Sequence, residues 1–263
     1  MLALNGQAIA YEMEGEGVPL LFIHQVATDR RIWRYQRKSL SQRYRLIAVD
    51  VLGHGEIAGS PQGFSLEDTV DQLRMLLTQL RSGPTFVIGV SMGASIAIRL
   101  ALGDPASIRG LVLISPWSFD TSKHTRNLIE RLFRLAEAGD MASHADFFLR
   151  YTLPPVFLER HSDDYEALRT LVMEQDPRAI AYSWAAYIAA DVTGTLKDLQ
   201  VPSLVISGFG DLLTPPYLAR ALANELPMVE LEVWEEAGHF PFFEDPARFN
   251  RRVEKFIRQC MAQ

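Results

Sequence analysis

The segment Gly89-Val90-Ser91-Met92-Gly93 places a serine between an apolar run and a stretch rich in alanine and isoleucine. A serine on a sharp turn from strand to helix has its hydroxyl exposed above the edge of a sheet, and the strained turn requires small residues two positions away. Glycine on both sides meets this requirement, so we predict that Ser91 is a nucleophile. The backbone N–H of Met92, at the start of the following helix, is the predicted first donor to an oxyanion.

A serine hydroxyl needs a base to become a strong nucleophile, and the base needs a group that fixes its orientation. His239 lies in a predicted loop between the last strand and the last helix, which makes it the candidate base. Asp211 lies in a glycine-rich turn after the preceding strand and is the candidate acid. The predicted catalytic group is therefore Ser91, Asp211 and His239. Asp120, which follows a strand that ends at Ile114, is the reserve candidate for the acid.

These residues must be positioned by the strands and helices between them. Short, nearly continuous apolar runs are typical of strands buried on both faces of a parallel sheet, whereas apolar residues three and four positions apart indicate helices. These patterns predict strands over residues 7–12, 18–23, 45–49, 85–90, 111–114, 202–207 and 229–233, and helices over 64–80, 92–102, 216–224 and 246–261. Their alternation predicts an α/β fold with a mostly parallel central sheet and helices on both faces.

The alternation of strands and helices stops near residue 117 and resumes near residue 196. The segment between has helical patterns and no convincing strand, and Asp176-Pro177 is a favourable helix start. We therefore predict a core formed by residues 1–116 and 196–263, with residues 117–195 inserted as a helical lid.

Several motifs resemble those of the α/β-hydrolase superfamily, and they span nearly the whole chain. The chain order of nucleophile, acid and histidine matches that family, as do the segments Gly89-Val90-Ser91-Met92-Gly93, Gly208-Phe209-Gly210-Asp211, Gly238-His239 and Asp50-Val51-Leu52-Gly53-His54-Gly55, in which Leu52 replaces the family's arginine. Within the superfamily the chain looks most like small bacterial esterases and lactonases, such as the 3-oxoadipate enol-lactonase group. The resemblance implies the α/β-hydrolase fold and a serine hydrolase that cleaves a carboxylic ester or lactone through an acyl-enzyme, without cofactor or metal.

The chain departs from the family at His24-Gln25-Val26. The family usually has His-Gly at this point, and the next residue supplies the second backbone N–H of the oxyanion hole. In this alignment the second donor is the N–H of Val26, and Gln25 has a side chain where the family has glycine. The amide of Gln25 is itself able to donate a hydrogen bond into the site. We expect His24 and His54 to have structural roles.

The predicted lid is rich in aromatic residues, and ligand pockets are mostly apolar. This composition favours a small substrate with an apolar or aromatic part. The residues expected to line the substrate pocket are Gln25, Trp117, Phe147, Trp184 and Phe240. The three histidines of the predicted lid, His124, His144 and His161, are expected at the surface.

Composition excludes several other classes of protein. The chain has 263 residues and a formal charge of −6, without a basic run, which argues against a nucleic-acid partner. Its single cysteine, Cys260, cannot form a disulfide within the chain. No apolar run is long enough for a membrane span and the N-terminus lacks the pattern of a signal peptide, so we expect a cytoplasmic protein with a small-molecule substrate as its partner.

Three alternative functions remain open on the same scaffold, because a fold does not fix a function. One is a carbon–carbon bond hydrolase or a cofactor-free dioxygenase that uses histidine and aspartate as a base. Another is a ligand receptor that keeps the catalytic group but turns over slowly. A haloalkane- or epoxide-type hydrolase is disfavoured, since those relatives have aspartate where this chain has Ser91.

Overall fold

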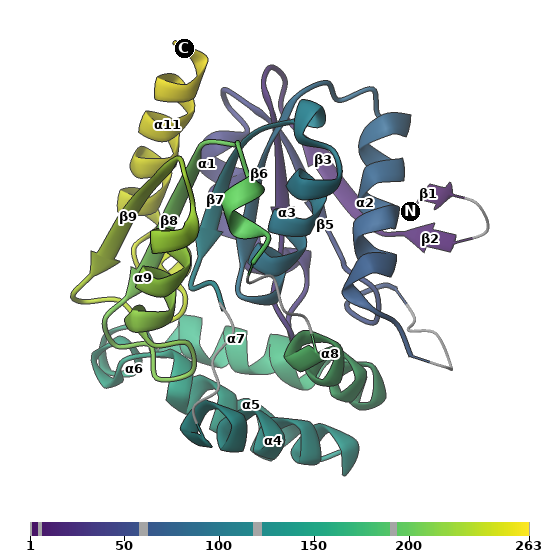
Figure 1. Ribbon diagram of the computed structural model, residues 1–263. Coiled ribbons are helices and arrows are strands. Elements are labelled where there is room, and N and C mark those ends of the chain that lie inside the picture. The colour runs from purple at the N-terminus through teal and green to yellow at the C-terminus, as the bar shows by residue number, and fades with distance from the viewer. Residues whose placement is uncertain (1, 5–6, 58–62, 118–122, 190–193, 263) are drawn as a thin grey trace.

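A seven-stranded sheet forms the centre of the computed structural model, which describes residues 2–4, 7–57, 63–117, 123–189 and 194–262 (Figure 1). The strand order is β3-β5-β4-β6-β7-β8-β9, and all neighbours are parallel except β3 and β5. The strands are β3 (Tyr11–Glu14), β4 (Pro19–Ile23), β5 (Arg45–Val49), β6 (Thr85–Val90), β7 (Ile108–Ile114), β8 (Ser203–Gly208) and β9 (Val229–Trp234). This confirms the predicted mostly parallel sheet.

Helices cover both faces of this sheet. On one face lie α2 (Leu66–Gln79), α3 (Met92–Gly103) and α9 (Pro216–Glu225), and on the other lie α1 (Arg34–Leu40) and α11 (Pro246–Met261) (Figure 1). Every residue of β4, β6 and β8 is buried, as expected for strands covered on both faces. The helix α2 begins with a capping box in which Ser65 and Asp68 bond to each other's backbone N–H.

The strand predicted over residues 7–12 is wrong, because the chain divides it at Ala10. Residues 7–9 form β2 (Gln7–Ile9), which pairs with β1 (Leu2–Leu4) in a separate two-stranded sheet, whereas β3 joins the main sheet. The carbonyl of Ala10 accepts a hydrogen bond from Asp50 N–H, where the chain enters the main sheet. The short helices α1 and α10 (Pro241–Glu244) are not predicted by periodicity, since α1 is mostly polar and α10 has four residues.

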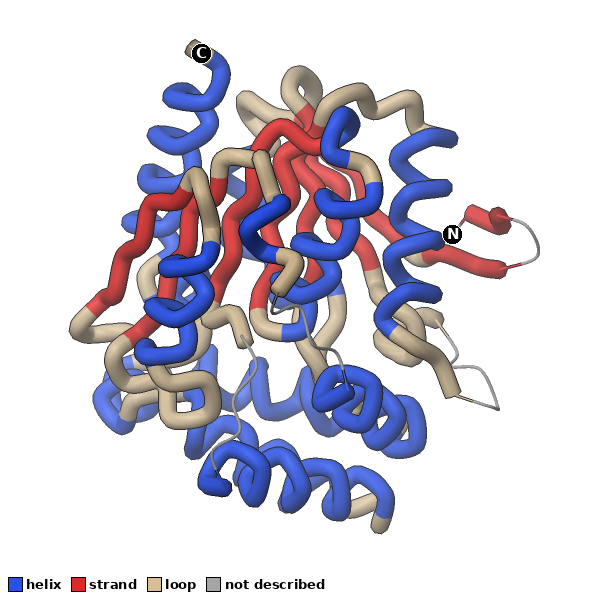
Figure 2. Tube along the Cα trace, in the orientation of Figure 1, coloured by secondary structure: helices blue, strands red, loops and turns tan. Residues whose placement is uncertain are grey.

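Five helices form a layer at the carboxyl-terminal edge of the sheet, below it in Figures 1 and 2. They are α4 (Lys123–Glu137), α5 (Met141–Thr152), α6 (Pro155–Arg160), α7 (Ser162–Met173) and α8 (Pro177–Ala189). The last residues of α5 bond to loops of the core, since Tyr151 O accepts from Leu212 N–H and Thr152 O accepts from His239 N–H. Within the described residues, no helix is both long and apolar enough to cross a membrane.

Candidate active site

Ser91 lies on a strained turn between β6 and α3. Its φ of 53° is in the left-handed region, and its N–H donates to Ile114 O at 2.9 Å. A Cβ atom on Gly89 would lie 2.2 Å from Gly93 O, and one on Gly93 would lie 2.3 Å from Ile23 O. Both contacts are with backbone, so only glycine fits at either position. The sequence spacing therefore produces the turn that places Ser91 at the end of β6, where its side chain is buried beneath the helical layer.

His239 and Asp211 form a fully buried pair, with Nδ1 and Oδ2 2.7 Å apart. The other carboxylate oxygen of Asp211 accepts hydrogen bonds from Leu213 N–H and Thr214 N–H, at 3.0 and 2.9 Å. The hydroxyl of Thr214 lies 2.7 Å from Asp211 Oδ2. The carboxylate is thus fixed so that it receives Nδ1–H of the imidazole. In this tautomer Nε2 carries a lone pair and is able to act as a base.

The loop that carries His239 is bonded on all sides. Its N–H donates to Thr152 O at 2.6 Å, and its carbonyl accepts from the hydroxyl of Ser115 at 3.0 Å. Glu244 accepts hydrogen bonds from Gly238 N–H and Phe240 N–H, the two neighbours of the histidine. Burial raises the pKa of Glu244 to about 7. Through these hydrogen bonds the Glu244 side chain holds the backbone on both sides of His239.

The end of β7 bonds to the segments that carry Ser91 and His239. Ile114 O accepts from Ser91 N–H, and the next residue, Ser115, bonds to His239 through its hydroxyl and to the Thr214 hydroxyl through its carbonyl. Two adjacent residues of one strand end thus hold the turn that carries Ser91 and the loops that carry Asp211 and His239.

A tyrosine of the helical layer contacts Ser91. The hydroxyl groups of Tyr187, on α8, and Ser91 lie 3.3 Å apart. Burial raises the pKa of Tyr187, which keeps its phenol protonated and able to donate. Among the described residues, Nε2 of His239 is buried without a hydrogen-bond partner. The serine hydroxyl is thus bonded to α8, and in the part of the chain that the structure describes Nε2 of His239 is left without a partner.

Two neutral histidines hold the loop that contains Gln25 and Val26. His24 Nδ1–H donates to Gln25 O at 2.8 Å, and its Nε2 accepts from Val51 N–H at 3.0 Å. His54 Nε2 accepts from Ala27 N–H at 3.2 Å. Burial lowers the pKa of His24 to about 4 and that of His54 to about 3. Both rings therefore act as neutral structural groups, in agreement with the sequence analysis.

The predicted pocket aromatics pack against different neighbours, and one of them contacts the imidazole of His239. The ring of Phe240 is 5.1 Å from that of His239. Trp117 contacts Tyr187 at 4.9 Å, whereas Phe147 packs on Tyr151 at 4.7 Å. The neighbour of Phe147, Phe148, is the residue of α5 whose ring contacts His239, at 6.5 Å. The reserve acid, Asp120, lies outside the described residues.

The expected surface position of His144 is wrong. Its side chain is fully buried, and its Nε2 accepts a hydrogen bond from Trp184 Nε1 at 3.0 Å. Burial lowers the pKa of His144 to about 4, so it is neutral. It lies three residues after Met141 and four before Phe148, on the buried face of α5. This helical spacing can be read from the sequence and indicates burial. His161 is exposed as expected, and the side chain of His124 lies outside the described part.

Tyr187, Thr214 and Glu244 contact the site, but the sequence analysis did not assign them to it. Thr214 had a local signal, because an aspartate in a turn commonly bonds to backbone two and three residues later. Tyr187 and Glu244 had no such signal, since the contact of Tyr187 depends on the placement of α8 and that of Glu244 on a short helix.

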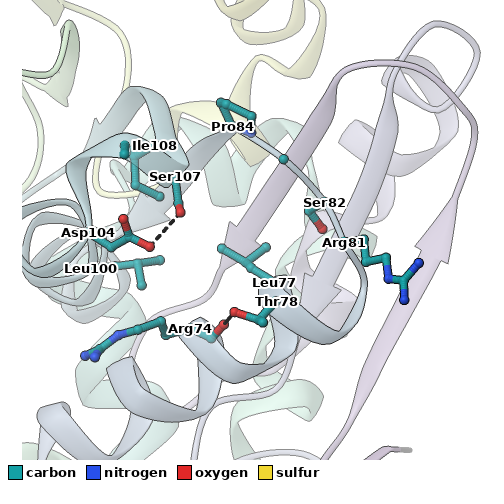
Figure 3. Close-up of a pocket in the computed structure, with 12 residues that line it drawn as sticks. Arg74, Leu77, Thr78, Arg81, Ser82, Pro84, Leu100, Asp104, Ser107 and Ile108 are labelled. Atoms are coloured by element: carbon teal, nitrogen blue, oxygen red, sulfur yellow. Dashed lines mark hydrogen bonds between the residues drawn. The ribbon is translucent and has the colours of Figure 1, made fainter.

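A pocket elsewhere on the molecule is not part of this site. It has a volume of about 190 Å³ and lies among Arg74, Ser82, Leu100 and Ser107 (Figure 3). These residues flank the amino-terminal ends of β6 and β7, whereas Ser91 lies at the carboxyl-terminal end of β6. Among the residues with described positions, no cluster of three or more histidine, cysteine or acidic side chains is arranged to hold a metal ion.

Comparison with known proteins identifies the fold independently. The family model for the alpha/beta hydrolase fold matches residues 18–246. The pimeloyl-(acyl-carrier protein) methyl ester esterase of Nitrosomonas europaea is 30% identical over 92% of this chain and 96% of its own. The solved enol-lactonase of Burkholderia xenovorans LB400 has a TM-score of 0.90 at 25% identity, over 98% and 99% of the two chains. A thermophilic esterase from Thermogutta terrifontis has a TM-score of 0.88 at 27% identity, over 96% and 93%.

Proposed function

Because the chain belongs to the α/β-hydrolase family and is a hydrolase, we propose that it cleaves a carboxylic ester or lactone of a small, partly apolar substrate through an acyl-enzyme on Ser91. The buried 2.7 Å contact between His239 and Asp211, next to a serine on a strained turn, is the observation that carries this proposal. The relatives named as an esterase and an enol-lactonase support the same reaction class.

The reaction begins when Ser91 Oγ attacks the substrate carbonyl and His239 Nε2 takes its proton. The carbonyl oxygen becomes an oxyanion, which the N–H groups of Met92 and Val26 stabilise. The imidazolium then gives its proton to the leaving oxygen, and the acyl–oxygen bond of the ester breaks. Water, deprotonated by His239, resolves the acyl-enzyme. Asp211 keeps the imidazole in the tautomer that these steps need.

The helical layer α4–α8 is proposed to act as the lid, within the segment 117–195. Two of its contacts with the core are made by Tyr187, which bonds Ser91, and by Phe148, which packs on His239. The aromatic groups Trp117, Trp184 and Phe240 supply apolar walls around this region. Such walls fit a substrate with an apolar part. The proposed location of the protein is the cytoplasm.

A substrate panel tests the proposed function. Purified protein is assayed by pH-stat against small alkyl esters and lactones, with the Ser91→Ala variant as the control. We expect the rate of hydrolysis to fall at least about a thousandfold in the variant, because loss of an activated nucleophile has an effect of that size. Undiminished hydrolysis of the best substrate by Ser91→Ala would overturn the acyl-enzyme.

A second candidate, a cofactor-free dioxygenase, has one observation in its favour. The hydroxyl of Ser91 bonds to Tyr187, while Nε2 of His239 has no hydrogen-bond partner among the described residues. This arrangement suits a His239–Asp211 base that removes a proton from the substrate without serine. Oxygen uptake that depends on His239 but not on Ser91 would establish it.

A further inference from the structure

Gln25 is a buried amide whose side chain has no hydrogen-bond partner within the described structure. Its exposed fraction is 1%, and both Oε1 and Nε2 are unpaired. Gln175, another buried glutamine, donates to Asp29 Oδ2 and Leu171 O and accepts from Gly55 N–H. A buried polar group without a partner destabilises a fold, so such groups are rare in the absence of another role.

The position of Gln25 is next to the nucleophile. The neighbouring parallel strands β4 and β6 are in register at Ile23 and Gly89. Gln25 follows Ile23 by two residues, and Ser91 follows Gly89 by two residues. Both therefore extend from the same edge of the sheet on adjacent strands. A Cβ atom on Gly93, two residues beyond the serine, would lie 2.6 Å from His24 O, so the two segments are in direct contact.

The backbone of Gln25 is rigidly held. Its carbonyl accepts from His24 Nδ1–H at 2.8 Å and lies 3.4 Å from the Thr28 hydroxyl. Ala27 has a φ of 64°, a left-handed conformation, and its N–H is bonded to His54. Strained backbone of this kind persists where the surroundings fix it, and it is frequent at ligand sites. The unpaired amide is therefore presented by a preorganised loop.

We propose that Gln25 is a specificity-determining residue, and that it selects substrates with a neutral hydrogen-bonding group, such as a hydroxyl, within a few atoms of the scissile carbonyl. This inference rests on the proposed ester hydrolysis. An amide offers one acceptor and two donor hydrogens, which complement a hydroxyl. A carboxylate would place a second negative charge near Asp211 and would use only the donors. Any water that satisfies the amide in the free enzyme must be replaced by a group that restores its hydrogen bonds.

The test uses pairs of esters that differ by one hydroxyl. The pairs are methyl lactate with methyl propanoate, methyl 3-hydroxybutanoate with methyl butanoate, and 2-hydroxyethyl propanoate with propyl propanoate. Each kcat/KM is divided by the rate of cleavage by hydroxide, which removes intrinsic reactivity. In at least one pair we expect the hydroxylated ester to be favoured by about 10- to 100-fold, the discrimination available to a site that must pair a buried polar group.

Gln25→Leu removes the amide at similar volume and is expected to bring this ratio close to one, because the hydroxylated ester loses more of its kcat/KM than the other ester of the pair. Gln79→Leu makes the same change on the exposed surface of α2 and should keep the ratio. If Gln25→Leu does not fold, Gln25→Asn keeps the amide one methylene shorter and should give an intermediate ratio.

Three results would overturn the inference. One is a preference below about threefold in every pair, because a single weak hydrogen bond already corresponds to about that ratio. Another is an equal loss of kcat/KM on both esters of a pair in Gln25→Leu, which would mean that the amide stabilises the oxyanion instead. In either case, labelling of Ser91 by a fluorophosphonate would show that the proposed function survives. Failure of both labelling and ester cleavage by folded protein would remove the proposed function as well.

Discussion

The core loops at the carboxyl-terminal edge of the sheet and the helices that cover them meet the same site by different means. Asp211 and His239 are held by hydrogen bonds from backbone and side chains on every side, including those of Thr214 and Glu244. The helical layer contacts the site with aromatic rings and with the hydroxyl of Tyr187, and the end of α5 adds a backbone bond from His239 N–H to Thr152 O. A dense polar network fixes one geometry, whereas apolar contacts adapt to different shapes. The chemistry should therefore depend on the core, and the choice of substrate on the helices and on Gln25.

Removal of the acid should have the largest effect on catalysis. Asp211→Asn is expected to lower kcat by about 10³- to 10⁴-fold, because the neutral amide no longer fixes the tautomer of His239. Steady-state kinetics on the best ester measures it. Asp120→Asn, which changes the other candidate acid, should stay close to the unaltered enzyme. The reverse ranking of the two variants would transfer the role to Asp120.

A methyl group at the turn between β6 and α3 should destabilise the core. Gly93→Ala puts a Cβ atom within 2.3 Å of Ile23 O, a backbone atom that cannot move freely. We expect a loss of about 1–3 kcal/mol in the free energy of unfolding, typical of overpacking, and a lower melting temperature. Gly103→Ala, at the other end of α3, meets only the end of Arg74 at 3.9 Å. It should leave the melting temperature unchanged or raise it. An equal loss of the free energy of unfolding in both variants would contradict the close packing at the turn between β6 and α3.

Removal of one oxygen from the helical layer should have a moderate effect. Tyr187→Phe deletes the hydroxyl that lies 3.3 Å from Ser91 Oγ, and we expect kcat/KM to fall by about three- to tenfold, the free energy of one hydrogen bond. Tyr182→Phe makes the same change on the exposed side of α8 and should have no effect on kinetics. Unaltered activity in Tyr187→Phe would show that α8 does not position the nucleophile.

The contribution of Glu244, which bonds the backbone on both sides of His239, should depend on pH. Burial raises the pKa of Glu244 from its ordinary 4.5 to about 7, so the folded protein binds this proton more tightly than the unfolded chain does. The stability from this group is present below about pH 4.5 and is lost as pH rises through 7.

Glu244→Gln abolishes this titration and keeps an acceptor for Gly238 N–H and Phe240 N–H. The free energy of unfolding of the unaltered protein relative to this variant should fall between pH 4.5 and 7, by at most about 1.4 kcal/mol per pH unit. Denaturant unfolding at several pH values measures the difference. A difference that rises over the same interval would contradict the assigned pKa.

The sequence predicts the core well because local rules and spacing determine it. The two glycines that flank Ser91 and the turn that contains Asp211 each have a local physical requirement, and apolar runs locate the buried strands. The helical layer is less predictable, since helical periodicity does not say which residue of α8 reaches Ser91. His144 illustrates both cases: its spacing from Met141 and Phe148 indicated burial, but its bond to Trp184 depends on how α5 and α8 pack.

The most direct test of an activated serine is covalent labelling. The protein is incubated with a fluorophosphonate probe and its intact mass is recorded, with Ser91→Ala and His239→Ala as controls and circular dichroism as a check of folding. The account predicts a single adduct on the unaltered protein and none on either variant, because the probe reacts with a serine that a histidine has activated. An adduct on Ser91→Ala, or no adduct on folded, unaltered protein, would contradict the assignment of Ser91 as the nucleophile.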